Sequence, residues 1–326
     1  AARAARIQRR YGRGANGLVR EDPYGLARDS RGIGFATADA LARRLGIEAN
    51  APVRLRAALH DVLDEASADG HCALPEPALL DAASELLALS RDALALALAR
   101  EVEAHALVRD TIAGEGAIFL PRLHRAEREA AARLRRLREG APPWPAIDEE
   151  RAVAWAQQQL GVALSPSQRE AVDALLRAKV GVLTGGPGVG KTTLARTLLA
   201  ILRAKDVRLA LEARTLHRLL EVDPSRRDRG GFKRGVDAPL DCDLVVVDEA
   251  SMVDIALFAA LLRAVPAHAA LLLVGDADQL PSVGPGRVLA DVIASRVGVC
   301  VELREVFRQA AQSGIVRAAH AIHEGR

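Results

Sequence analysis

An eight-residue glycine-rich segment constrains the fold of this chain more than any other feature. Residues 185–192 read Gly-Gly-Pro-Gly-Val-Gly-Lys-Thr and fit the pattern G-x-x-x-x-G-K-[ST] in full. An apolar, strand-like run precedes the segment at 180–183, and a helical pattern follows it at 194–199. In that setting the glycines let backbone N–H groups surround a phosphate at the N-terminus of a helix. The flanks therefore favour a phosphate-binding loop over an ordinary glycine-rich turn.

Two side chains of this loop have the chemistry for a nucleoside triphosphate. Lys191 would reach the β- and γ-phosphates, and the hydroxyl of Thr192 would hold Mg²⁺. The predicted nucleotide-binding residues of the loop are Gly185, Gly186, Pro187, Gly188, Val189, Gly190, Lys191, Thr192 and Thr193.

A second apolar run, 244–247, reads as a parallel strand that is buried on both faces. Asp248 and Glu249 follow it directly. From the carboxyl end of such a strand, Asp248 would reach the Mg²⁺ held by Thr192. Glu249 would then orient or deprotonate an attacking water. Taken alone, the same residues also fit an acidic surface turn.

A third apolar run, 271–274, leads into Gly275-Asp276-Ala277-Asp278-Gln279. Gln279 is a candidate sensor of the γ-phosphate. Without the two motifs above, a polar turn would explain this segment as well.

Six segments resemble, in the right order, the RecD-like branch of the superfamily 1B helicases. They are Leu-Ser-Pro-Ser-Gln-Arg at 164–169, the glycine-rich loop at 185–193, Thr-Leu-His-Arg-Leu-Leu at 215–220, Asp-Glu-Ala-Ser-Met-Val-Asp at 248–254, the segment 275–286 and Phe-Arg-Gln at 307–309. The resemblance is dense over residues 160–313 and looser in the first half of the chain. It implies ATP as the nucleotide and 5′→3′ movement on DNA.

The resemblance also gives roles to residues that spacing does not explain. Gln168 is similar to the glutamine that reads adenine in the family, and Arg308 to an arginine that reaches the γ-phosphate. Thr215 and His217 resemble a motif that contacts the DNA strand. A guanidinium suits phosphate because it stays charged and binds in a bidentate manner. From the residues alone, His217 and Arg308 are equally compatible with polar surface positions.

The amino-terminal end also points to DNA. Residues 30–42 resemble a helix-hairpin-helix, in which Gly32 and Gly34 would let the backbone approach a phosphate. Such contacts bind DNA without reading its sequence. Residues 1–20 contain six arginines and no acidic residue. A plain helical hairpin and a solvated basic helix remain the alternatives for these two segments.

Composition sets wider bounds. The net charge of +3 over 326 residues does not by itself indicate nucleic-acid binding, so the local basic segments carry that argument. The three cysteines are far apart and predict reduced thiols in a cytoplasmic protein, with neither a disulfide framework nor a zinc site. No apolar run is long enough to predict a membrane span.

The expected fold class is α/β. A RecA-like parallel sheet domain with the phosphate-binding loop would follow an all-α region that contains the helix-hairpin-helix. We predict a DNA-binding region at 1–48, a helical domain and linker at 49–145, and the first RecA-like motor domain at 146–326. Residues 222–238 interrupt the sheet; the family resemblance implies a hairpin pin that splits duplexes, and a polar loop is the alternative.

Two departures from the family pattern affect the expected activity. The strand 207–211 runs directly into Glu212, where a second DNA-contacting motif would be expected, so we expect a segment to be missing there. A second RecA-like domain does not follow within the printed sequence. The hypothesis is that this chain alone binds nucleotide but hydrolyses it weakly, whereas the full protein would hydrolyse ATP and translocate.

The sequence thus predicts an ATP-dependent DNA helicase that moves 5′→3′ on single-stranded DNA and unwinds duplexes in repair or recombination. The expected partners are single-stranded DNA, duplex junctions and a single-strand-binding protein, with the enzyme itself a monomer and no membrane involved. Two alternatives remain open: a translocase that remodels complexes without productive unwinding, and a DNA-binding scaffold with an inactive ATPase.

Overall fold

The computed structural model describes residues 22–25, 34–209, 215–225 and 231–305. The chain forms two compact units, which we call unit 1 (Ala1–His124) and unit 2 (Arg125–Arg326). The division lies inside the helix α8 (Pro121–Leu137) and therefore before the proline-rich linker at which a boundary was expected. In the described part of the chain no helix is both long and apolar enough to cross a bilayer.

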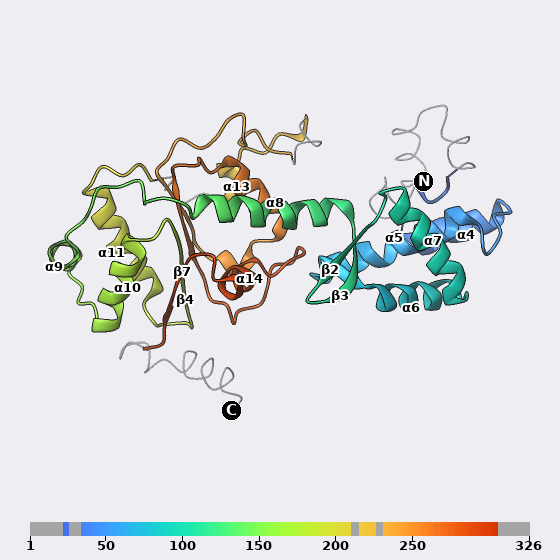
Figure 1. Cartoon of the computed structure of the whole chain (residues 1–326), viewed down its shortest axis with the longest axis horizontal. Helices are drawn as coiled ribbons and strands as arrows, with labels where there is room; N and C mark the ends of the chain where they lie inside the picture. Colours follow the sequence, from blue (N-terminus) through green and yellow to red (C-terminus); the bar gives the residue numbers. More distant parts are fainter. Residues whose placement is uncertain (1–21, 26–33, 210–214, 226–230, 306–326) are drawn as a thin grey trace. The chain divides into compact units, whose positions relative to one another are not determined.

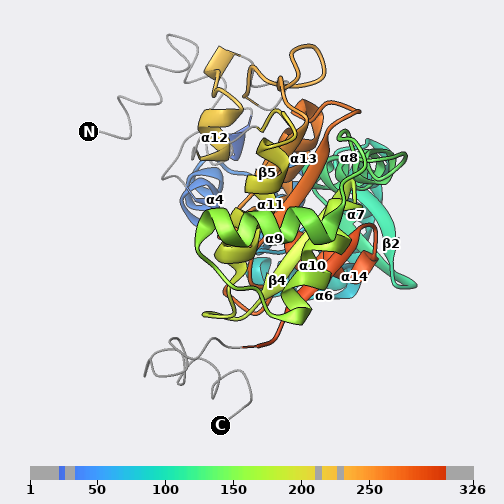
Figure 2. The same ribbon diagram turned by 90° about the vertical axis from the view of Figure 1, so that its left-hand side faces the viewer.

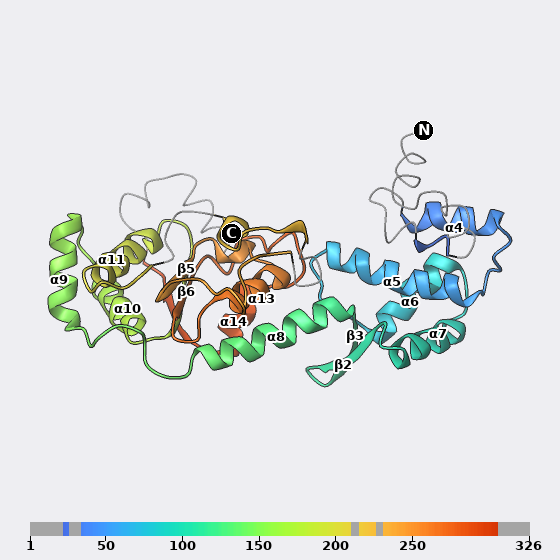
Figure 3. The same cartoon turned by 90° about the horizontal axis from the view of Figure 1, so that it is seen from above.

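Unit 1 is built mainly from helices, as the Ala/Leu-rich composition predicts (Figures 1 and 3). Leucines at helical spacing are completely buried where these helices meet, including Leu79, Leu94 and Leu98. Besides the start of α8, the helices among the described residues of this unit are α4 (Phe35–Arg44), α5 (Pro52–Ala68), α6 (Glu76–Leu87) and α7 (Arg91–Glu103).

A small antiparallel sheet also belongs to unit 1, so the expectation of an all-α region before the motor domain is wrong. Its strands are β1 (Ala73–Pro75), β2 (Val108–Ile112) and β3 (Glu115–Phe119), in the order β1-β3-β2. The β2–β3 turn consists of Ala113 and Gly114, both with positive φ, and such a two-residue turn matches the twist of a hairpin. The second half of β3 is buried, from Ala117 to Phe119.

A buried polar cluster fastens α4 within unit 1. Its residues are Tyr24, Asp39 and Arg54, each of which is less than one-tenth exposed. Arg54 donates to both oxygens of Asp39, from Nε at 2.7 Å and from Nη2 at 3.0 Å, and the hydroxyl of Tyr24 donates to Oδ1 at 2.7 Å. Burial alone would raise the pKa of Asp39, but these hydrogen bonds hold it below its ordinary value. The carboxylate therefore stays charged and joins α4 to α5.

Unit 2 contains the expected parallel sheet, and its strand order is β5-β6-β4-β7. All three neighbouring pairs are parallel, and the two central strands are buried along their whole length. The strands are β4 (Val180–Gly185), β5 (Leu244–Val247), β6 (Ala270–Val274) and β7 (Val299–Leu303). Continuous apolar runs form such strands because both faces are covered.

Helices cover both faces of this sheet, with α10 and α11 on one side of the strands and α13 and α14 on the other (Figures 1 and 3). Figure 2 shows α9, α10 and α11 together on the first side, where they share a core with the strands. These helices are α9 (Glu149–Leu160), α10 (Pro166–Leu176), α11 (Lys191–Arg203), α13 (Ile255–Ala264) and α14 (Val288–Ser295).

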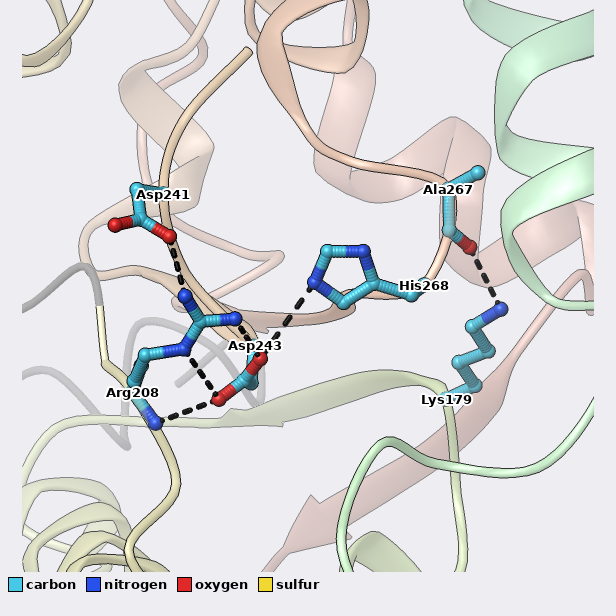
Figure 4. Close-up of polar contacts among 6 residues, drawn as sticks. All are labelled: Lys179, Arg208, Asp241, Asp243, Ala267 and His268. Atoms are coloured by element: carbon cyan, nitrogen blue, oxygen red, sulfur yellow. Dashed lines mark hydrogen bonds and ion pairs between the residues drawn. The ribbon is translucent and has the colours of Figure 1, made fainter.

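Polar contacts fix the amino-terminal edge of the sheet (Figure 4). Arg208 donates to Asp243 through its backbone N–H and its guanidinium, at 2.8–3.1 Å, and also contacts Asp241. These hydrogen bonds from Arg208 hold the pKa of Asp243 below its usual range. Lys179 donates to the carbonyl oxygens of Glu139 and Ala267, each at 2.9 Å. The edge opposite the phosphate-binding loop is thereby fastened from several elements.

The linker expected at 140–145 is free of helix and strand, but it is not detached from unit 2. The indole N–H of Trp144 donates to the carbonyl of Leu176 at 2.7 Å, and the Trp144 ring packs against the core of the sheet domain. The lysine contact to Glu139 holds the same stretch from its other end.

Asp39→Ala should lower the free energy of unfolding of unit 1 by about 3–5 kcal/mol, because Arg54 would keep a buried charge without its partner. Urea denaturation followed by circular dichroism measures this change. Asp81→Ala is the matched control, since it removes an exposed ion pair with Arg91 and should cost less than about 1 kcal/mol. Equal losses for the two variants would contradict this account of the cluster.

Candidate nucleotide-binding site

The carboxyl ends of three parallel strands meet at one edge of the sheet and carry the three predicted motifs. β4 runs into the glycine-rich loop, β5 runs into Asp248, and β6 runs into Gly275. Because β6 lies between β5 and β4, its turn separates the loop from the acidic residues. This edge is where open α/β sheets bind ligands.

The backbone of the loop needs its glycines. Gly185, Gly188 and Gly190 have φ values of 145°, 78° and 90°, a region that L side chains rarely adopt. A Cβ on Gly185 would also collide with the carbonyl oxygen of Leu303 on β7. Gly190 is the N-cap of α11, so the loop ends directly on a helix N-terminus, whose first N–H groups have no partner within the helix.

Lys191 lies folded back over the loop. Its Nζ donates to the carbonyl oxygen of Gly185 at 2.5 Å and to that of Gly186 at 2.9 Å. The neighbouring Thr192 is exposed. The ammonium group is therefore held at the mouth of the loop, where an anionic phosphate would meet it.

Close backbone contacts join the β6 turn to its neighbours on both sides. The N–H of Gly275 donates to the carbonyl of Leu183 on β4 at 3.1 Å. On its other side, a Cβ on Gly275 would lie 3.1 Å from the backbone nitrogen of Ala250, which follows the acidic pair. The hydroxyl of Thr184 accepts from Ala277 N–H at 3.4 Å. Thr184 is not among the predicted site residues, although its hydroxyl lies at the end of an apolar strand-forming run.

Asp248 and Glu249 are both exposed at this edge. Oδ1 of Asp248 accepts from the N–H of Glu249 at 2.9 Å. Glu249 has a φ of 52°, so its backbone is left-handed as the chain enters the short helix η3 (Ala250–Met252). A non-glycine residue in this conformation is uncommon and is often found at functional sites. The turn thus presents two exposed carboxylates at the end of one strand.

Gln168, the predicted adenine reader, is only 3% exposed and makes local contacts. It forms a capping box with Ser165, in which Oε1 accepts from Ser165 N–H at 3.1 Å and Ser165 Oγ accepts from Gln168 N–H at 3.3 Å. Its Nε2 donates to the carbonyl of Val189, inside the glycine-rich loop, at 3.5 Å. The spacing of Ser165 and Gln168 in Ser-Pro-Ser-Gln is itself the sequence signal of a capping box.

The remaining predicted residues are not all brought to this edge. Gln279 is exposed in the β6 turn, and its N–H donates to the carbonyl of Asp276 at 3.3 Å. Thr215 is the N-cap of α12 (Leu216–Leu219), and the ring of His217 lies 5.9 Å from that of Phe232.

Gly34 is the N-cap of α4 and belongs to unit 1, not to the sheet domain. Gly32 and Arg308 lie outside the described residues. So does the junction after Leu211, where a missing segment was expected.

Comparisons with known proteins agree with this arrangement. A family model described as "ATP-dependent RecD2 DNA helicase HHH domain" matches residues 1–73, and one described as "AAA domain" matches residues 168–285. The ATP-dependent RecD2 DNA helicase of Deinococcus radiodurans is 32% identical in an alignment 349 positions long, which covers 99% of this chain. The chain belongs to the RecD-like helicase family.

The match covers 47% of the Deinococcus protein, so the chain spans about half the length of that relative. The RecD subunit of the RecBCD enzyme of Mycobacterium tuberculosis is 38% identical in an alignment 167 positions long, which covers 39% of this chain and 28% of that one. A solved structure, the Pif1 helicase of Candida albicans, aligns at 21% identity with a TM-score of 0.34, over 51% of this chain and 45% of that one.

The side chains of this RecD-like edge fit a nucleotide with Mg²⁺. Thr192 and Asp248 are exposed, and their side chains offer oxygen atoms of the kind that Mg²⁺ prefers. Lys191 offers a cation for phosphate. The hydroxyl of Ser251 is buried in the β5 turn and has no hydrogen-bond partner among the described residues. The edge therefore holds spare donors and acceptors that a polar ligand would satisfy.

Gly185→Ala should lower the free energy of unfolding of the RecD-like sheet domain by more than about 3 kcal/mol, since it adds a steric collision to an unfavourable φ. Thermal unfolding measures the loss. Gly161→Ala is the matched control: Gly161 has a φ of 63° with open space around it, so only the backbone cost of about 1 kcal/mol applies. Similar losses in both variants would show that Leu303 does not restrict the loop.

Proposed function

We propose that this chain forms the amino-terminal and first motor domains of an ATP-dependent DNA helicase that moves 5′→3′ on single-stranded DNA. The convergence of the glycine-rich loop, the acidic turn and the β6 turn at one sheet edge carries the proposal. The similarity to the RecD2 helicase supports DNA as the substrate. The direction of movement and a role in repair or recombination rest on the family alone.

In this proposal the site residues have separate tasks. The loop glycines and the N-terminus of α11 bind the phosphates, and Lys191 neutralises their charge. Thr192 and Asp248 hold Mg²⁺, which polarises the phosphate oxygens when bound. Glu249 orients the attacking water and accepts its proton.

Other residues would sense the nucleotide. Gln279 would report on the γ-phosphate from the β6 turn, and Arg308 would contact it. Gln168 would read adenine beside the glycine-rich loop, since its amide already donates to the carbonyl of Val189 in that loop.

Two DNA-contacting regions are proposed. Thr215 and His217 would contact the translocated strand from α12, where both residues lie outside the core of the sheet domain. Gly32 and Gly34 would bind the phosphate backbone at the amino-terminal helix-hairpin-helix. We also infer a single-strand-binding protein as a partner, a monomeric enzyme and a cytoplasmic location, the last of which agrees with the three dispersed cysteines.

The insertion at 222–238 is the proposed strand separator. Its described parts form a paired stem: Val222 bridges Phe232 in antiparallel fashion, and Asp223 N–H donates to the carbonyl of Gly231 at 2.7 Å. Arg234 donates to Glu221 at the base of the stem at 2.8 Å. A paired stem that follows α12 is suited to exclude one strand of a duplex.

Lys191→Ala should reduce ATP hydrolysis stimulated by single-stranded DNA at least about 100-fold in the intact protein, because the phosphate charge loses its stabilising cation. Lys205→Ala is the matched control, since this exposed lysine follows the other end of α11 and should leave turnover unchanged. Steady-state turnover with an oligonucleotide measures both. Unchanged turnover in Lys191→Ala would remove the whole site assignment.

Replacing residues 226–230 with two glycines should abolish unwinding and leave hydrolysis on single strands intact, because the shortened insertion would no longer exclude a strand. Duplexes with a 5′ or a 3′ single-stranded tail provide the assay, and the preferred tail also reports polarity. If the intact protein hydrolyses ATP but unwinds neither substrate, it is a translocase without productive unwinding. If it hydrolyses none, it is a DNA-binding scaffold.

A further inference from the structure

The buried cluster in unit 1 lies beside the amino-terminal segment for which DNA binding is proposed. The rings of Tyr24 and Phe35 stack with their centroids 5.6 Å apart and an interplanar angle of 20°. Both side chains are buried, with exposures of 1% and 6%. Tyr24 precedes Gly25 and Phe35 follows Gly34, so the stack brings together two points of the chain on either side of residues 26–33.

Hydrogen bonds then fasten this stack to α5. The Tyr24 hydroxyl donates to Asp39, Asp39 accepts from two nitrogens of Arg54, and Nη1 of Arg54 donates to the carbonyl of Ala49 at 2.8 Å. The turn that contains Tyr24 is closed by Asp22, which accepts from Gly25 N–H with its carbonyl at 3.1 Å and its carboxylate at 3.0 Å.

Such a cluster is an inefficient way to stabilise a fold. Burying a charged pair costs free energy that well-packed apolar side chains would not cost, and exchange for such side chains is often neutral or stabilising. A charged cluster does, however, fix one geometry, because each hydrogen bond has a direction and every unmatched arrangement is penalised. Its contribution in unit 1 is therefore a defined orientation of α4.

The orientation concerns the exposed N-terminus of α4. Gly34, the N-cap, has extended backbone at φ −83°, and nothing lies within 4 Å of the position that a Cβ would take. Ala36 and Thr37 in the first turn are also exposed, and the first turn contains no acidic residue. Thr37 N–H donates to the carbonyl of Gly34 at 3.1 Å, whereas the N–H groups of Phe35 and Ala36 have no partner within the helix and are the donors that a phosphate would meet.

We propose that Tyr24, Phe35, Asp39 and Arg54 are positioning residues for DNA binding, and that they hold the N-terminus of α4 ready for the phosphate backbone of duplex DNA. The inference rests on the proposed DNA contact at Gly34. A site that is already ordered binds more tightly because less freedom is lost on association. The four side chains touch no DNA themselves.

Two mild substitutions test this in the intact protein. Tyr24→Phe removes the hydroxyl and keeps the ring stack, and Phe35→Leu removes the stack and keeps an apolar side chain. Each should weaken binding to a blunt-ended duplex, measured by fluorescence anisotropy, by about three- to tenfold. The plot of log affinity against log salt should become less steep by about one for each DNA phosphate that the variant no longer binds.

Leu98→Ala is the control for stability, because Leu98 is fully buried on α7 and takes no part in the cluster. It should lower the melting temperature without changing the salt slope. ATP turnover with a single-stranded oligonucleotide reports on unit 2 and shows that each protein is folded. If the cluster variants lose affinity only as far as Leu98→Ala does, the positioning role is overturned.

Gly34→Val separates this inference from the proposed contact, since the backbone at Gly34 tolerates a side chain that would block a phosphate. Weaker binding by Gly34→Val with unchanged binding by the cluster variants overturns the positioning role and keeps the contact. Weaker binding by the cluster variants alone supports positioning and moves the contact elsewhere in this end of unit 1. Unchanged binding by all three overturns both.

Discussion

Parallel hydrogen bonding between β5, β6 and β4 is the constraint on which the rest of unit 2 depends. Parallel strands end on the same side, so three segments that are far apart in sequence deliver their polar turns to one edge. The pairing is reinforced from the opposite edge, where Arg208 and Lys179 fasten the strand starts. A weakness at either edge would therefore shift the loop and the acidic turn against each other.

Close approach, rather than side-chain packing, sets the geometry of the functional edge. Gly185 lies against the backbone of β7, and Gly275 lies against the backbone after Glu249. Neither position has room for a methyl group, so the absence of a side chain is what allows these close backbone approaches. In unit 1 a buried ion pair fixes the geometry instead. Asp39 and Arg54 define how α4 is oriented on α5, because their hydrogen bonds have a direction that apolar contacts lack.

Much of the sheet domain could be predicted from the sequence, because continuous apolar runs and a glycine-rich loop have few other uses. β5 begins and ends where the apolar run does, and β6 starts one residue earlier. The antiparallel sheet of unit 1 was missed because β2 contains Arg109 and Asp110, which weaken the alternation that marks a strand. The tie between Gln168 and the loop could not be predicted from spacing, since it depends on how α10 packs against Val189.

The position of Lys191 has a consequence for affinity. Its ammonium group already donates to two carbonyl oxygens of its own loop. An incoming phosphate would therefore have to replace these hydrogen bonds. The net gain is the difference between two sets of polar contacts, and the carbonyls that are released must find N–H donors or water. The proposed triphosphate would therefore bind less tightly than it would to an unpaired ammonium group, which suits the proposed hydrolytic cycle, because its product has to leave at every step.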